Sequence, residues 1–232
     1  MSRHDVFVTL KVLVVLIAAW VMASQVRKPG RWLGRVMARA MNRSHAAMTA
    51  WGLSHIAVEK NFTILDVGCG GGKTIDTLAS LAPDGRVFGI DYAAGSVATA
   101  RATNAARIAA GRVDIQAGAV SHLPFGADTF DIVTAVETHY YWPDLARDVS
   151  EVQRVLKPGG TFLIIAEAYR GRRLDWLYRP AMAMLRARYL TIAQHRELFA
   201  NAGYVDVVVD TEQSKGWIYA KGTKPGAAPE VR

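Results

Sequence analysis

The chain has 232 residues, of which 51% are hydrophobic and 21% are charged, and its formal net charge is +8. This composition excludes a wholly disordered chain, and the length suits one α/β core with a small extension. The single cysteine, Cys69, excludes an intrachain disulfide and favours a reducing, cytoplasmic environment.

The N-terminal residues 1–26 hold the most apolar segment of the chain. Residues 6–26 come close to the ~20 residues that cross a bilayer, although Lys11 interrupts them near one end. The uninterrupted stretch 12–23 also suits a docked core helix or the apolar part of a signal peptide. Of these alternatives we favour an uncleaved membrane anchor.

Residues 27–60 form a basic region that we expect to be helical. Six Lys or Arg residues and no acid lie between Arg27 and Arg43. Arginines recur every four residues from Arg31, beside an apolar face, which indicates an amphipathic helix. Its basic stripe either contacts an anionic membrane surface or faces water. With an anchor before it, this cluster would keep the following domain on the cytoplasmic side of the membrane.

Residues 61–222 alternate short apolar runs with helical stretches, followed by a flexible tail at 223–232. Strands are expected at residues 62–67, 86–91, 113–117, 130–135, 161–167, 205–209 and 217–221. Helices are expected at 73–81, 96–110 and 145–156, where Pro and Gly residues follow, and from the N-cap Thr191 to residue 201. The pattern predicts a Rossmann-like α/β fold: a seven-stranded, mostly parallel sheet with helices on both faces, plus an N-terminal helical extension.

A glycine loop connects the first strand to the first helix of this core. Its glycines at 68, 70 and 72 allow a tight turn and leave no side chain between the backbone and a ligand. Asp91 ends the second strand about twenty residues later, where a carboxylate can accept hydrogen bonds from both ribose hydroxyls. Loop, acid and topology together predict a nucleotide-type cofactor site.

Two other glycine-loop motifs do not fit. A dinucleotide-binding loop needs its third glycine at position 73, which is Lys73. A phosphate-binding P-loop needs its first glycine at position 67, which is Val67. Lys73 is therefore interpreted as a residue of the first helical turn.

Five ordered motifs carry a family resemblance: ILDVGCGGG at 64–72, GIDYA at 89–93, LPF at 123–125, FDIV at 130–133 and EVQRVLKPGG at 151–160. With them the chain resembles the class I S-adenosylmethionine-dependent methyltransferases of the small-molecule, methyltransferase type 11-like kind, over roughly residues 62–221. The resemblance implies an enzyme that uses S-adenosyl-L-methionine as its cofactor.

The resemblance also implies site residues. Asp66 and the backbone of Gly68 and Gly70 would hold the methionine part of the cofactor, Asp91 its ribose, and Tyr92 would lie against its adenine. In such enzymes an acid that bonds the adenine amino group often follows the third strand, but this chain has Ala119 there. We expect the backbone around Val120 to contact the adenine, with Ser121 or His122 as a substitute contact.

The acceptor should bind beside residues 137–144, which follow the fourth strand at the carboxyl edge of the sheet. His139 is the candidate general base because of its intrinsic pKa, and a histidine that shapes the pocket is the alternative. Tyr140 is a second catalytic candidate. A role in the pocket wall is favoured for Tyr140, and also for Tyr141 and Trp142. Glu137 either orients the cofactor's amino group or is structural.

The acceptor class is suggested by residues 169–190, which mix apolar and aromatic side chains with six arginines. In related enzymes this region contributes to the substrate lid, so we expect a small-molecule or lipid acceptor, such as an isoprenoid quinone precursor. Solvated arginines around a core helix are the alternative. The histidines show no metal-ligand spacing, and we predict no metal site.

Two other functional classes are alternatives. One is a membrane-tethered, non-catalytic cofactor-binding protein of the same fold. The other is modification of nucleic acid, which is disfavoured because the basic residues cluster before the core. We therefore expect no nucleic-acid partner.

Overall fold

The computed structural model describes residues 45–172 and 175–226. The predicted anchor and most of the predicted basic helix and tail lie outside these ranges. Within them, none of the helices combines the length and the apolar character that a membrane crossing needs. The membrane anchor at residues 1–26 therefore stays a prediction.

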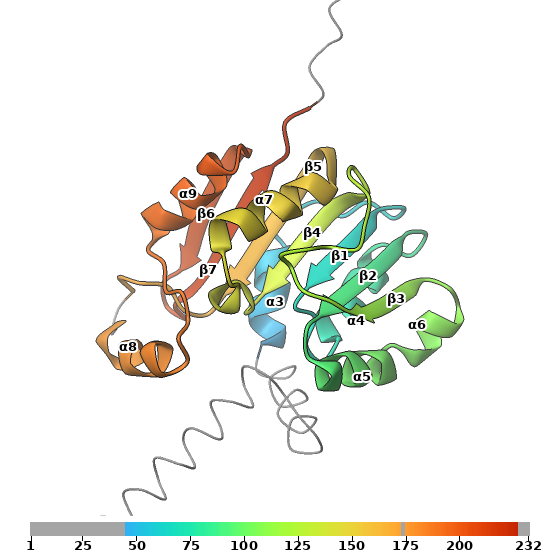
Figure 1. The fold of residues 1–232 in the computed structure, drawn as a ribbon, viewed down its shortest axis with the longest axis horizontal. Coiled ribbons are helices and arrows are strands. Elements are labelled where there is room, and N and C mark those ends of the chain that lie inside the picture. The colour runs from blue at the N-terminus through green and yellow to red at the C-terminus, as the bar shows by residue number, and fades with distance from the viewer. Residues whose placement is uncertain (1–44, 173–174, 227–232) are drawn as a thin grey trace, which may run out of the picture.

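One sheet of seven strands organises the described residues, in the order β3-β2-β1-β4-β5-β7-β6 (Figure 1). The strands from β1 to β5 pair in parallel, and β7 is antiparallel to both β5 and β6. This confirms the predicted fold class. Their bounds are β1 Thr63–Val67, β2 Arg86–Asp91, β3 Val113–Ala117, β4 Phe130–Val136, β5 Leu156–Ala166, β6 Val205–Glu212 and β7 Trp217–Thr223.

Helices cover both faces of the sheet. In Figure 1, α7 and α9 lie in front of it, and α3 lies behind it. The helix bounds are α3 Ala46–Leu53, α4 Lys73–Leu81, α5 Ala94–Thr103, α6 Ala105–Ala109, the 3₁₀ helix η1 His139–Tyr141, α7 Leu145–Val155, α8 Asp175–Met184 and α9 Ile192–Asn201.

The two faces of the sheet carry separate apolar cores, because successive side chains of a strand point to opposite faces. On β5, Phe162 and Ile164 belong to the core under α7 and α9. Leu163 and Ile165, between and after them, belong to the core under α3, α4 and α5. The strands read as continuous apolar runs since both faces are buried.

The structure corrects two predicted elements. The helix expected at 96–110 is two helices that meet at Asn104, whose side chain donates hydrogen bonds to the carbonyls of Gly72 and Ala100, both at 2.9 Å. Residues 157–160, whose Pro and Gly residues were expected to separate the helix from the next strand, lie within β5. This strand begins at Leu156, directly after α7. The predicted N-cap Thr191 is confirmed, with a capping box to Gln194.

Candidate active site

A cavity of about 610 Å³ opens at the carboxyl edge of the sheet, beside the ends of β1, β2 and β4. This volume is within the range of ligand pockets in proteins. Its wall includes eight residues that the sequence predicted for the cofactor: Asp66, Gly68, Gly70, Asp91, Tyr92, Ala119, Val120 and Glu137. The fold thus brings these residues together, while their individual roles stay predictions.

At two positions of the glycine loop, a side chain would clash with the rest of the protein. Gly68 has a φ of 74°, and a Cβ there would overlap the side chain of Thr138. Gly72 has a φ of 78°, and its Cβ would lie 2.7 Å from Cα of Ala100 on α5. An added Cβ on Gly70 would meet nothing closer than the Gly68 carbonyl at 4.0 Å. The loop therefore packs closely against the rest of the protein at Gly68 and Gly72, and leaves space beside Gly70.

Asp91 ties this loop to the end of β2. Its Oδ2 accepts a hydrogen bond from the Gly70 amide at 3.0 Å, and its Oδ1 accepts one from the Ala93 amide at 2.8 Å. Burial raises the pKa of Asp91, while these hydrogen bonds oppose the shift. Tyr92 beside it is 50% exposed and lines the cavity, so its ring is available to a planar ligand.

Asp66 is the most buried carboxylate of the cavity, with 1% of its surface exposed. Its Oδ1 accepts a hydrogen bond of 2.7 Å from the Thr134 hydroxyl on β4. Burial raises the pKa of Asp66 to about 7; the Thr134 hydrogen bond opposes this shift, and the nearby Asp91 charge adds to it. Sequence reasoning missed Thr134, which lies inside an apolar strand and has no motif of its own.

The expected adenine end of the cavity is formed by backbone. Ala119 and His122 form an isolated antiparallel bridge, and the His122 amide donates to the Ala119 carbonyl at 3.2 Å. Ala119 and Val120 line the cavity in this turn, whereas Ser121 and His122 are not among the lining residues. The substitute contact expected from Ser121 or His122 stays a prediction.

Beyond the loop, the cavity continues to a wall of aromatic and aliphatic side chains. These belong to the segment after β4 and to α3: Val136, Tyr141, Trp142, Pro143, Ala46 and Ala50. Trp142 is held by a hydrogen bond from its indole nitrogen to the Thr138 hydroxyl at 3.4 Å. This end of the cavity suits an apolar or aromatic ligand.

Glu137 also lines the cavity and adopts a left-handed backbone conformation with a φ of 57°. Its Oε1 accepts hydrogen bonds from the Tyr140 hydroxyl at 3.3 Å and from the Glu167 amide. Burial raises the pKa of Glu137 to about 8, and the charge of Glu167 contributes to the shift. Glu137 is therefore mostly protonated at neutral pH.

The two predicted catalytic residues, His139 and Tyr140, do not line the cavity. His139 is completely buried, with its Nε2 3.4 Å from Nε2 of His195, and burial lowers its pKa well below the usual value. The Tyr140 hydroxyl bonds the backbone of Ala168 at 3.1 Å. This placement favours the structural alternative for both residues, and their catalytic roles stay predictions.

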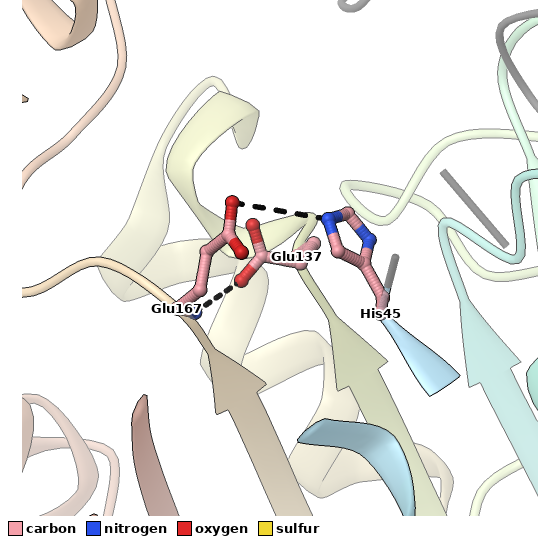
Figure 2. A group of neighbouring side chains, drawn as sticks. All are labelled: His45, Glu137 and Glu167. Atoms are coloured by element: carbon pink, nitrogen blue, oxygen red, sulfur yellow. Dashed lines mark hydrogen bonds and ion pairs between the residues drawn. The ribbon is translucent and has the colours of Figure 1, made fainter. Parts of the chain in front are cut away.

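His45, which the sequence analysis did not select, lies on the cavity wall close to Glu137 and Glu167 (Figure 2). Its Nε2 is 3.8 Å from Oε1 of Glu167. One potential ligand atom from each of the three residues lies within 4.8 Å of the others, and the absence of a metal stays a prediction. No motif marks His45, because it precedes the core and reaches the cavity only through the packing of α3.

The predicted substrate lid forms α8, with Pro180 inside the helix and Trp176 65% exposed. Among the described residues between 169 and 190, none lines the cavity. The lid role stays a prediction.

The family model and the curated relatives of this chain are methyltransferases. A family model described as a methyltransferase domain matches residues 65–164. A demethylmenaquinone methyltransferase of Symbiobacterium thermophilum is 32% identical over 62% of this chain and 68% of its own length. A ubiquinone/menaquinone biosynthesis C-methyltransferase of Geotalea daltonii is 30% identical over 58% of this chain and 56% of its own length.

Solved structures share the fold. The methyltransferase bound to the Trm112 activator of Haloferax volcanii has a TM-score of 0.70 and 23% identity, over 82% of this chain and 94% of that one. A phosphoethanolamine N-methyltransferase of Haemonchus contortus, in complex with S-adenosyl-L-methionine, has a TM-score of 0.67 and 18% identity, over 77% of this chain and 52% of that one.

Proposed function

The chain belongs to the class I S-adenosylmethionine-dependent methyltransferases, and from this premise we propose that its acceptor is an amphiphilic aromatic molecule of the isoprenoid-quinol type. The observation that carries the proposal is the continuity of one cavity from the glycine loop to the apolar wall at Tyr141 and Trp142. The names of the relatives from Symbiobacterium and Geotalea, both of which refer to quinone methylation, support it.

The residues of the loop end fit S-adenosylmethionine. Gly70 leaves its face open, the Asp91 carboxylate lies at the end of β2, and the half-exposed Tyr92 ring lies next to it. Asp66 supplies a buried carboxylate for the amino group of the methionine part. When bound, this cofactor supplies a methyl group on a positively charged sulfur, which needs no further activation.

The protein's remaining task is to hold the acceptor in line with the methyl group and to exclude water. Val136, Trp142 and Pro143 provide apolar cavity surface for an aromatic ring. The apolar segment 6–26 and the basic stripe after it would bring the core to the cytoplasmic surface of a membrane, where such an acceptor is dissolved. We keep this location as part of the proposal.

A methylation assay tests the function. Purified full-length protein is incubated with isotope-labelled S-adenosylmethionine and a chemically reduced, short-chain demethylmenaquinone, and the product is identified by mass spectrometry. We expect one added methyl group on the quinol ring. Parallel reactions with phosphoethanolamine and with RNA should give none; methylation of either in place of the quinol would contradict the acceptor class.

Matched variants separate the function from the non-catalytic alternative. Asp91→Asn removes a cavity carboxylate, so cofactor binding measured by calorimetry should weaken at least about tenfold, since hydrogen bonds to a charged group contribute about 1.5–3 kcal/mol. Asp114→Asn makes the same change at an exposed position of β3 and should bind like wild type. Binding of the cofactor without methylation of any acceptor would support the non-catalytic alternative.

A further inference from the structure

We propose that His45 is the general base that accepts the acceptor's proton, and that Glu167 positions its imidazole ring. This inference rests on the proposed function and adds a catalytic site that the family resemblance does not assign. Its basis is the position of the ring on the cavity wall, its 3.8 Å contact with the Glu167 carboxylate and the orientation of its second nitrogen.

Close packing of α3 holds His45 at the cavity. His45 is the N-cap residue of α3, and Met48 and Leu53 of this helix are buried in the core behind the sheet. Gly52 faces β5 so closely that a Cβ there would lie 2.5 Å from Ile165. Since the backbone of α3 rests on the end of β5, His45 is fixed within reach of Glu167, the residue that follows that strand.

The contact with Glu167 assigns a role to each ring nitrogen. Nε2 faces the Glu167 carboxylate at 3.8 Å, and the carboxylate favours a proton on this nitrogen. A proton on Nε2 leaves the lone pair on Nδ1 of the neutral ring. In Figure 2, Nδ1 lies on the side of the ring away from both carboxylates, and its lone pair is directed away from them. Nδ1 is thus the atom that can accept a proton.

The protonation states agree with this assignment. Burial lowers the pKa of His45, and the opposing effect of the Glu167 charge is smaller, so the ring is neutral at pH 7. Glu167 and Glu137 each place a carboxylate oxygen within 4.8 Å of a nitrogen of the His45 ring. Glu137 is a weaker candidate for the base, because it holds its own proton at neutral pH and its Oε1 already accepts two hydrogen bonds.

The other acids of the cavity lie at the loop end. Asp66 is bonded to Thr134, and Asp91 to the amides of Gly70 and Ala93. Both are assigned to the cofactor, so His45 is left for the acceptor. Its side chain is 17% exposed, which leaves it open to a ligand but shielded from bulk water.

The proton balance of methylation on a quinol ring gives His45 a defined step. A quinol hydroxyl gives its proton to Nδ1, and its electrons increase the nucleophilicity of the ring carbon. That carbon bonds the methyl carbon, whose bond to sulfur breaks with the electron pair remaining on sulfur. The ring carbon then releases its hydrogen as a proton to solvent, and the oxygen takes its proton back from His45. The net reaction releases one proton.

His45→Gln and His45→Ala test the base. The glutamine amide can still donate to Glu167 but cannot accept a proton, so kcat should fall by about 10²–10⁴, the usual contribution of general acid–base catalysis. Cofactor binding measured by calorimetry should stay within twofold of wild type. Added imidazole should restore part of the His45→Ala rate, which would not occur if His45 only supported the fold.

Glu167→Gln tests the positioning role through pH. At saturating cofactor, kcat rises with pH as His45 loses its proton. Removing the Glu167 charge lowers the pKa of His45, so this rise should move to lower pH, and the same shift should appear when the ring is titrated by NMR. Glu197→Gln, an exposed glutamate of α9, is the matched control and should leave both curves unchanged.

The outcomes are distinguishable. If wild-type protein does not methylate the reduced demethylmenaquinone, the proposed function fails, and this inference fails with it. If wild type is active and His45→Gln matches it, only the inference fails. Loss of wild-type activity with a chelator and its recovery with a divalent cation would also overturn the inference, in favour of a metal held by His45, Glu137 and Glu167.

Discussion

At the scale of single residues, Asp66 has opposing demands on it. Burial favours its neutral form, whereas the amino group of the cofactor's methionine part favours the charged form. The 2.7 Å hydrogen bond from Thr134 helps to keep the carboxylate charged. With its pKa raised to about 7, Asp66 changes charge within the physiological pH range, so a cofactor that binds it through its amino group should have a pH-dependent affinity.

We therefore expect Thr134→Val to raise the pKa of Asp66 further, because it removes the one hydrogen bond that lowers it. Cofactor affinity should rise with pH in both proteins, but the midpoint of the rise should lie at higher pH in the variant. At pH 7 the variant should bind several-fold more weakly, since a neutral hydrogen bond contributes about 0.5–1.5 kcal/mol. Calorimetric titrations between pH 6 and 8.5 measure this shift.

Valine and threonine have similar shapes, so a cavity or clash does not explain a change in this variant. Thr161→Val, a partly buried position of the neighbouring strand β5, is the control and should keep the wild-type pH profile. Identical profiles for Thr134→Val and wild type would show that Asp66 does not control binding.

Residues of the site differ in how far the sequence reveals them. Asp66, Gly68, Gly70 and Asp91 could be predicted because their roles depend on local order: a strand, a turn and the end of the next strand. His139 was predicted from its intrinsic pKa and its position after the fourth strand, and neither reveals that its ring is buried next to His195. His45 and Glu167 are 122 positions apart in the sequence and meet only through the docking of α3, which no local pattern predicts.

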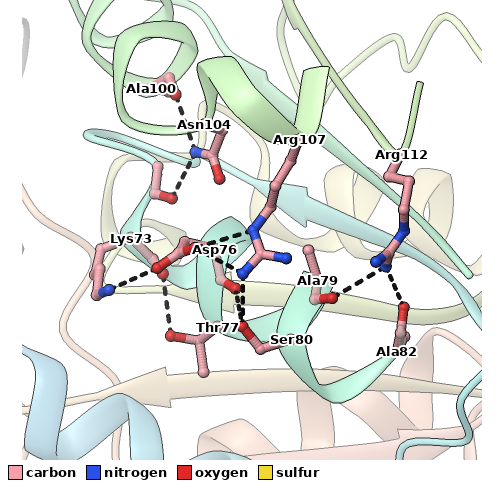
Figure 3. A network of polar contacts seen from close by, with 11 residues as sticks. Lys73, Asp76, Thr77, Ala79, Ser80, Ala82, Ala100, Asn104, Arg107 and Arg112 are labelled. Atoms are coloured by element: carbon pink, nitrogen blue, oxygen red, sulfur yellow. Dashed lines mark hydrogen bonds and ion pairs between the residues drawn. The ribbon is translucent and has the colours of Figure 1, made fainter. Parts of the chain in front are cut away.

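At the scale of elements, the glycine loop is supported by the joint between α5 and α6. Asn104, buried at this joint, bonds the Gly72 carbonyl and the Ala100 carbonyl (Figure 3). The same close-up shows Arg107 of α6 bound to Asp76 of α4 at 3.0 Å. The joint between α5 and α6 is thus fixed against the glycine loop and against α4, the helix that follows the loop.

We expect Asn104→Ala to destabilise the protein by about 0.5–1.5 kcal/mol, because it removes the Asn104 hydrogen bond to the buried Gly72 carbonyl, which then keeps only the bond from the Asp76 amide. Cofactor affinity should fall as well, since the loop loses its support from α5. Chemical unfolding and calorimetry measure the two effects. Thr103→Ala, at the exposed neighbouring position, should change neither by more than a few tenths of a kcal/mol.

The elements themselves were largely predictable, because a buried parallel strand and an amphipathic helix each have a clear apolar period. The predicted bounds are wrong where a specific contact overrides the local sequence pattern. A continuous helical pattern over 96–110 does not reveal that the Asn104 amide bonds the glycine loop and the two helices meet there. Pro158 and Gly159 end the helical pattern, but β5 already includes them through its pairing with β4 from Leu156.

At the scale of the whole molecule, the sheet and its two cores provide stability, and the cavity reduces it. Asp66 and Glu137 are acids with pKa values raised to about 7 and about 8 by burial. Between their ordinary pKa and the raised value, the folded protein binds more protons than the unfolded chain. Protonation of the two acids therefore stabilises the folded state at lower pH. This stabilisation is lost as the pH rises through their raised pKa values.

Asp66→Asn should remove one of these contributions. The amide is neutral at every pH and can still accept the Thr134 hydrogen bond, so the variant should be more stable than wild type at pH 8, by at least about 1 kcal/mol. The difference should shrink toward pH 5, where Asp66 is protonated in the wild type. Thermal melting curves at both values test this in the absence of cofactor.

Adding S-adenosylmethionine should reverse the order. A ligand that binds only the folded state raises its stability with concentration, so the cofactor should raise the melting temperature of wild type but not that of Asp66→Asn. The asparagine variant would then be the more stable protein alone and the less stable one with cofactor. If both proteins gained equally from the cofactor, Asp66 would have no part in binding, and its burial would be a purely structural cost.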